Sequence, residues 1–78
     1  MQWRAVESSQ ISEVGHDSDN QTLGVRFKGK GKWAASEYHY QFVSDDLFQA
    51  MLTAESVGKF FAERIKAFPN DYPYTKVA

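Results

Sequence analysis

The 78-residue sequence contains no cysteine. This absence excludes disulfide crosslinks, thiolate zinc sites and a cysteine nucleophile. No apolar run approaches the roughly 20 residues that a membrane-spanning helix needs, and residues 1–4 lack the apolar core of a signal peptide. We therefore expect a cytoplasmic protein that does not enter a membrane.

The sequence also lacks an excess of charge of either sign. Nine Lys and Arg residues face ten Asp and Glu residues, which gives a net charge of −1. No global electrostatic field therefore draws the chain onto nucleic acid or a membrane, and any nucleic-acid binding must come from a local patch. The length is sufficient for a single domain, which we expect to span residues 1–78.

Alternation of apolar and polar residues predicts three strands, over residues 4–15, 22–28 and 36–43. The first does not alternate strictly, so we expect a bulge or bend near Ser8 and Ser9. The turns between the three strands are short, which favours an antiparallel meander.

A helical period follows the third predicted strand. Ser44 can cap a first helix and Ser56 a second, and Pro69 ends the second helix. The pattern predicts an α+β fold, in which a three-stranded antiparallel β-meander is followed by two C-terminal helices packed on one face of the sheet. The predicted core residues are Leu23, Val25, Phe27, Tyr40, Phe42, Phe48, Leu52, Phe60, Phe61 and Ile65.

Three segments carry a family resemblance: Val-Glu-Ser-Ser-Gln-Ile at residues 6–11, Tyr-His-Tyr at 38–40 and Ala-Glu-Ser-Val-Gly-Lys-Phe-Phe at 54–61. With these segments, the sequence resembles the KTSC domain. That family is named for the C-terminal extension of some lysyl-tRNA synthetases and also occurs as small free-standing bacterial and phage proteins. The resemblance covers residues 6–74 and implies three strands followed by two helices. It also suggests RNA as a partner.

The sequence contains no recognisable catalytic pattern. Hydrolytic enzymes need a nucleophile, a base and an orienting acid, whereas His16 and His39 fall on different predicted elements. Residues 17–28 resemble a calcium loop only superficially, because Thr22 and Lys28 replace its essential glycine and bidentate glutamate. We expect a hairpin turn at residues 17–21. We also expect that the protein is not an enzyme and uses no metal or cofactor.

The sharpest charge feature is a basic segment at the end of the second predicted strand, formed by Arg26, Lys28, Lys30 and Lys32. Its cations could pair with phosphates, and the indole of the neighbouring Trp33 could stack on a base. Alternatively, the lysines only keep the loop solvated and discourage edge pairing, and Trp33 covers the open end of the core. The stretch between Phe27 and Tyr38 is longer than in the family, so residues 29–33 look specific to this protein. The candidate binding residues are Arg26, Lys28, Lys30, Lys32, Trp33, His39 and Gln41.

The tyrosine pair Tyr38 and Tyr40 has two interpretations. Aromatic residues two apart on an RNA-binding sheet stack on bases. Alternatively, both rings fill the core beneath the helices. We favour the core, because Phe42 continues the same face and must be buried.

The segment Ser-Val-Gly-Lys at residues 56–59 also has two interpretations. Free amides at a helix N-terminus, with Ser56, Gly58 and Lys59, could bind an anion. We favour simple capping of the helix by Ser56, because Glu55 would repel an anion.

These observations predict a small non-catalytic binding module that contacts RNA or DNA. An alternative is a phage or bacterial accessory protein that docks on a host protein. A third, more remote alternative is a binder of anions or nucleotide phosphates. The sequence does not determine the oligomeric state.

Overall fold

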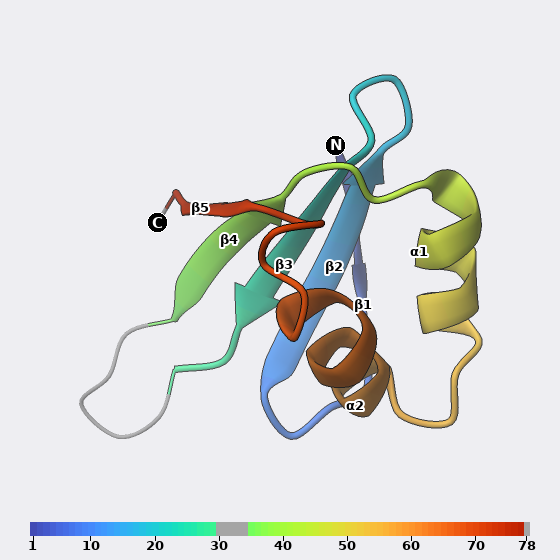
Figure 1. Ribbon diagram of the computed structural model, residues 1–78. Coiled ribbons are helices and arrows are strands. Elements are labelled where there is room, and N and C mark those ends of the chain that lie inside the picture. The colour runs from blue at the N-terminus through green and yellow to red at the C-terminus, as the bar shows by residue number, and fades with distance from the viewer. Residues whose placement is uncertain (30–34, 78) are drawn as a thin grey trace.

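The computed structural model describes residues 1–29 and 35–77. In this part of the chain, helices cover one face of a five-stranded sheet (Figure 1). The strands lie in the order β1-β2-β3-β4-β5, and every neighbouring pair is antiparallel. The elements are β1 (Gln2–Ala5), β2 (Ile11–Asp17), β3 (Thr22–Phe27), β4 (Ser36–Tyr40), α1 (Asp45–Leu52), α2 (Val57–Phe61), the π-helical turn η1 (Ala62–Lys66) and β5 (Tyr74–Lys76).

The prediction of an α+β fold with an antiparallel sheet and two helices is confirmed, but the prediction of three strands is wrong. The first predicted strand is two strands, because a turn at Ser8 interrupts it. The Ser8 Oγ accepts hydrogen bonds from the amides of Gln10 and Ile11, at 3.3 and 3.2 Å. The chain therefore reverses, and β1 pairs with β2 as a hairpin. The expected bulge lies further along, between Ile11 and Glu13.

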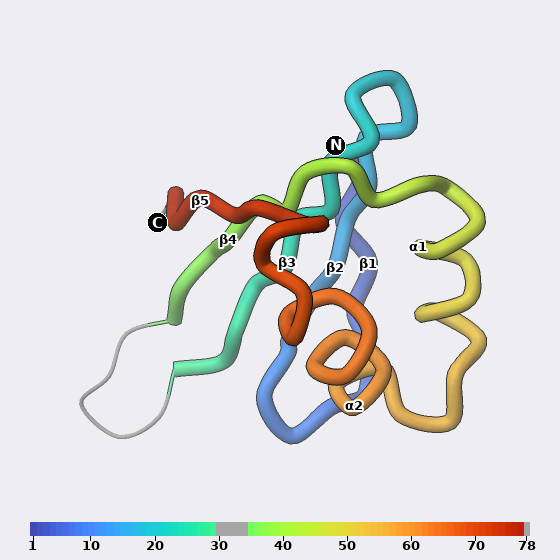
Figure 2. Tube along the Cα trace, in the orientation of Figure 1, coloured from blue at the N-terminus to red at the C-terminus, as the bar shows by residue number. Residues whose placement is uncertain are grey.

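The second additional strand is β5, which forms from the C-terminal tail. The tail follows η1 and returns along the free edge of β4, as the trace in Figure 2 shows. The amide of Gln41 donates to the Pro73 carbonyl at 2.8 Å, and the amide of Val77 donates to the Glu37 carbonyl at 2.9 Å. These two bonds fix both ends of β5 against β4.

Both helices begin at the serines that the sequence predicts as caps. The Ser44 Oγ accepts a hydrogen bond from the Leu47 amide at 3.1 Å, and the Ser56 Oγ accepts one from the Lys59 amide at 3.2 Å. The second helix changes to π-helical hydrogen bonding over η1 and ends at Lys66, before Pro69. No helix in the described ranges is long and apolar enough to cross a membrane.

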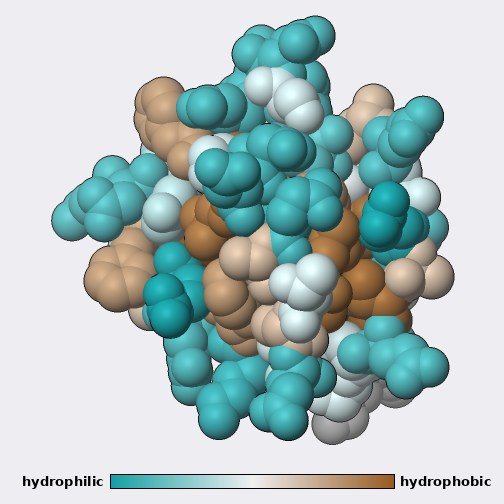
Figure 3. Space-filling view, turned by 90° about the vertical axis from the view of Figure 1, so that its right-hand side faces the viewer, coloured by the Kyte–Doolittle hydropathy of each residue, from teal (hydrophilic) through white to brown (hydrophobic). Residues whose placement is uncertain are grey.

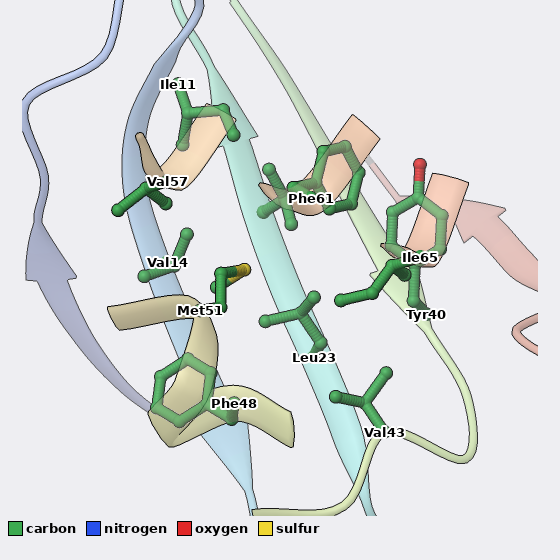
Figure 4. Close-up of a cluster of buried hydrophobic side chains, with 11 residues drawn as sticks. Ile11, Val14, Leu23, Tyr40, Val43, Phe48, Met51, Val57, Phe61 and Ile65 are labelled. Atoms are coloured by element: carbon green, nitrogen blue, oxygen red, sulfur yellow. The ribbon is translucent and has the colours of Figure 1, made fainter. Parts of the chain in front are cut away.

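The core lies between the sheet and the helices (Figure 4). Phe48 of α1 lies in front of β2, whereas Phe61 and Ile65 lie in front of β3 and β4. Seen from the side of α1, the surface is largely hydrophilic, with apolar side chains showing between polar ones (Figure 3). The buried apolar residues are Ile11, Val14, Leu23, Val25, Tyr40, Val43, Phe48, Met51, Val57, Phe61 and Ile65.

The prediction that Phe42 belongs to this core is wrong. β4 ends at Tyr40, and Phe42 has a φ of 62° and is 67% exposed. The left-handed backbone turns the chain towards α1, and Val43 takes the buried place instead. The Val43 amide is held by the carbonyl of Gln21, at 2.8 Å. Leu52 and Phe60 are only partly buried and pack at the edge of the core.

Candidate functional site

The face of the sheet away from the helices carries Arg26 and His39, as the strand alternation predicts. Arg26 donates to Glu37 at 2.9 Å and to Glu13 at 3.2 Å, and its guanidinium lies 3.8 Å from the ring centre of Trp3. His39 Nε2 lies 2.9 Å from the other Glu37 oxygen. The hydrogen bond between Arg26 and Glu37 is the main cause that raises the pKa of Arg26 and lowers that of Glu37. The face is polar, but two carboxylates balance the charge of Arg26.

Side chains of the N-terminal residues Met1 and Trp3 cover part of this outer face, over β2 and β3, which the sequence does not reveal. Trp3 pairs with Gly15, and Gly15 in turn pairs with Gly24. A Cβ atom on Gly24 would lie 2.5 Å from the indole of Trp3. Gly24 therefore makes room for the indole, and a Cβ atom on Gly15 would lie 2.8 Å from the Met1 side chain. The close approach of Trp3 and Met1 explains why two glycines interrupt strands that are otherwise well patterned.

The remaining predicted site residues lie apart from Arg26 and His39. Lys28 Nζ donates to the Ser8 carbonyl at 2.6 Å, and the Gln41 side chain lies 3.4 Å from the Thr22 hydroxyl. Lys30, Lys32 and Trp33 lie outside the described residues. Of the four predicted binding residues that the structure describes, only Arg26 and His39 lie together.

The start of α2 has the geometry of an N-cap. Besides the bond from the Lys59 amide to Ser56, the side chain of Ser8 lies against this turn. A Cβ atom on Gly58 would lie 2.8 Å from the Ser8 Oγ. Gly58 thus allows the loop between β1 and β2 to approach the helix closely.

The turn between β2 and β3 is a hairpin turn, as predicted. Asp17 Oδ1 accepts hydrogen bonds from the amides of Asp19 and Asn20, at 3.1 and 3.4 Å, and Oδ2 accepts one from the Asn20 side chain at 2.8 Å. The side-chain bond from Asn20 is the largest cause of a lowered pKa of Asp17. The carboxylate is thus occupied in closing the turn.

A cleft of about 780 Å³ opens on the helix side of the sheet, between β3, β4, β5 and the end of η1. Its volume lies within the range of small-molecule sites. An aromatic wall and two cations dominate it. The wall is formed by Phe27, Tyr38, Tyr40 and Tyr74, and the cations are Lys28 and Lys66.

The rings of the wall support one another. Tyr38 packs edge-on to Phe27 with the ring centres 5.6 Å apart, and Tyr74 lies 5.8 Å from Tyr38 and 5.5 Å from Tyr40. Exposure increases towards the sheet edge, from 3% at Tyr40 to 56% at Tyr74. Tyr40 is a core residue, as predicted, whereas Tyr38 is half-buried and lines the cleft. Tyr38 thus packs against the core with part of its ring and leaves the rest accessible in the cleft.

Burial, followed by the nearness of Tyr74 and Tyr38, raises the pKa of Tyr40 to about 12. The phenol is therefore neutral at physiological pH. A neutral phenol is a weak nucleophile, and its ring contributes surface rather than charge to the cleft.

The charge of the cleft differs from that of the whole chain. Of the described residues that line it, Lys28 and Lys66 are charged and none is Asp or Glu, although the chain as a whole carries −1. Lys66 is the last residue of η1, and the preceding residue, Ile65, is fully buried. The π-helical turn thus anchors its end in the core and places the next side chain at the cleft, a use of π-turns that recurs at functional sites.

The arrangement can hold a planar ring against the aromatic wall and an anion beside the lysines. The sequence analysis placed Lys28 among the binding residues and considered base stacking for Tyr38 and Tyr40, although it favoured the core. It assigned neither Lys66 nor Tyr74 to a site. The alternation of Tyr74 with Lys76 after Pro73 is the only strand-like signal in the tail, and it is too short to identify a strand from the sequence.

A family model and a solved structure indicate the same family. The model of the KTSC domain matches residues 7–68. An uncharacterised protein from Stutzerimonas stutzeri is 32% identical over 73 residues, covering 94% of this chain and 93% of its own length. A protein from Tsukamurella paurometabola is 40% identical over 55 residues, covering 70% and 75%. The crystal structure of a KTSC domain protein from Yersinia pestis superposes with a TM-score of 0.82 at 31% identity, covering 99% of this chain and 97% of that one.

Proposed function

The chain belongs to the KTSC domain family, and we propose that it is a small, non-catalytic module that binds single-stranded nucleic acid in the aromatic cleft. One observation carries the proposal. Aromatic rings, graded from buried to exposed, line one cleft together with two lysines, and no carboxylate occurs among the described lining residues.

The aromatic wall favours a ligand with flat, unpaired rings. Base–aromatic stacking tolerates any sequence, because every base presents a π-face. In a duplex the bases stack on one another and are not accessible to Tyr38 or Tyr74. The cleft is therefore suited to single strands.

The lysines favour an anionic ligand. Lys28 is fixed at the rim by the Ser8 carbonyl, and Lys66 is exposed at the end of η1. Phosphates supply the negative charge that such cations recognise, and their contacts weaken with salt. The association of the family with lysyl-tRNA synthetases points to RNA as the first nucleic acid to test.

A protein partner is the second candidate, and Phe42 favours it. This ring is 67% exposed on a left-handed backbone, which is unfavourable for a bulky residue. An exposed ring held in this way suits docking on another protein. It lies outside the lining of the cleft, so the two candidates predict different contact surfaces.

The test is fluorescence anisotropy with labelled single-stranded RNA, single-stranded DNA and duplex of mixed sequence, at increasing salt. We expect single strands to bind more tightly than duplex. The double variant Lys28→Gln/Lys66→Gln should weaken binding and flatten the slope of log K against log salt by about 0.7 for each lost contact.

The matched control is Arg4→Gln/Arg64→Gln, which removes the same charge from exposed residues outside the cleft. It should retain most of the affinity. Equal weakening by both double variants, or no binding of any oligonucleotide at low salt, would overturn the proposal and favour a protein partner.

A further inference from the structure

We propose that the cleft continues across β5 as a second nucleotide subsite, in which Tyr74 stacks on a base and Lys76 binds the phosphate that links it to the base in the cleft. The inference rests on the proposed function. It adds that the ligand is a strand of at least two nucleotides and not a mononucleotide.

The register of β5 places these two side chains on the face of the cleft. Tyr74 pairs with Tyr40, and Lys76 pairs with Tyr38. Directly opposed residues of an antiparallel pair project from the same face, with Cβ atoms about 4.5–5.5 Å apart. On this face, Lys76 therefore lies beside Tyr38, and Tyr74 lies beside Tyr40.

The helices leave this part of the face uncovered. Core contacts of α2 and η1 lie in front of β3 and β4, and β5 lies beyond them at the sheet edge (Figures 1 and 4). All three β5 residues are exposed. Tyr74 remains 56% exposed even though its ring contacts two other tyrosines.

The exposed ring is nevertheless held in place. Backbone bonds at Pro73 and Val77 fix both ends of β5, and Tyr38 and Tyr40 support the buried side of the Tyr74 ring. A ring that is packed on one side and free on the other can stack on a base without losing much conformational freedom. Lys76 is the next residue of β5 on the same face as Tyr74. From there it can contact the backbone of a ligand that leaves the cleft.

The experiment compares ligand lengths by titration calorimetry at low salt, with adenosine monophosphate, the dinucleotide ApA and a five-nucleotide oligoadenylate. We expect the dinucleotide to bind at least tenfold more tightly than the monophosphate. Lys76→Gln should weaken binding of the dinucleotide and pentanucleotide and leave the monophosphate unchanged. Arg4→Gln, which removes the same charge from an exposed residue of β1 outside the cleft, is the matched control and should change neither.

Tyr74 is tested by two substitutions. Tyr74→Ala should weaken binding of the dinucleotide by about 5- to 150-fold, the range of one base–aromatic stack, whereas Tyr74→Phe keeps the ring and should bind like the parent. Far-UV circular dichroism of each variant verifies that the sheet is retained.

Two results would contradict the second subsite while leaving the proposed function intact. One is equal affinity for the monophosphate and the dinucleotide, and the other is an effect of Lys76→Gln no larger than that of Arg4→Gln. Failure of all three ligands to bind would instead overturn the proposed function, and the subsite with it.

Discussion

Phe61 joins the helices to the sheet. It is 2% exposed, and its ring lies 5.1 Å from Tyr40 and 5.9 Å from Phe27. Both neighbours also belong to the wall of the cleft. The same residue therefore contributes to stability and supports the proposed binding surface from behind.

Phe61→Ala should lower the free energy of unfolding by about 3–5 kcal/mol, because it removes a large ring from a packed core. This loss is comparable to the whole stability of many small domains. Urea denaturation followed by circular dichroism measures it, with Phe68→Ala, at a ring that is 48% exposed, as the control. A cooperative transition close to that of the parent would show that Phe61 is not a core residue.

The ion pair of Arg26 and Glu37 should make stability depend on pH. The bond from Arg26 lowers the pKa of Glu37 below its ordinary value of 4.5. A carboxylate with a lowered pKa in the folded state stabilises the fold above its unfolded pKa, and this contribution is lost as pH falls through the lowered value. The difference in unfolding free energy between the parent and Glu37→Gln should therefore be present at pH 7 and diminish below about pH 4.5.

Urea denaturation of both proteins between pH 3 and 7 measures this difference. The control is Glu63→Gln, because Glu63 is exposed and has no ion pair within the described residues. A difference between parent and Glu37→Gln that does not vary with pH would contradict the assignment.

At the scale of elements, the start of α2 is held from two sides. Ser56 caps its first turn, and Ser8 packs against Gly58. The contact of Ser8 with Gly58 joins the loop before β2 to the helix that follows α1, so that segments far apart in the sequence meet at one helix end.

Ser56→Ala should lower the free energy of unfolding by about 1 kcal/mol, because the Lys59 amide loses its acceptor. Thermal and urea denaturation measure the loss, and Ser56→Asp, which restores a capping oxygen, should recover most of it. A variant of unchanged stability that loses stabilisation by added phosphate would instead support an anion site at residues 56–59.

At the scale of the whole molecule, the chain separates its cations between two faces. Arg26 is neutralised on the outer face, whereas Lys28 and Lys66 border the cleft. The net charge of −1 therefore conceals a positive region beside exposed rings. In the sequence, Lys30, Lys32 and Trp33 follow Lys28 within a few residues.

Changing Lys28, Lys30 and Lys32 together to Gln should leave the fold intact, because the sequence predicts a loop here and lysines at a protein surface contribute little to stability. If this segment contacts nucleic acid, the triple variant should bind more weakly and lose about 0.7–0.9 of salt slope for each contact. Trp33→Ala should lower affinity further, by about 1–3 kcal/mol, if the indole stacks on a base. Anisotropy titrations measure both effects, and a triple variant no weaker than Lys28→Gln alone would restrict binding to the cleft.

The sequence by itself determined the elements whose signals are local. Ser44 and Ser56 cap helices because a hydroxyl reaches an amide three residues on, and the alternation of Leu23, Val25 and Phe27 places one face of β3 in the core. The meander and the two helices therefore followed from residue pattern and from the resemblance to the KTSC domain.

Tertiary structure decided what depends on contacts between distant segments. β1 and β5 are short edge strands that exist because β2 and β4 offer them backbone partners, and their own periodicity is too brief to predict them. Pairing of β5 with β4 brings Tyr74 to Tyr38, and packing of η1 brings Lys66 to the same cleft. The candidate site is thus assembled from segments separated by dozens of residues, and no local pattern in the sequence records that assembly.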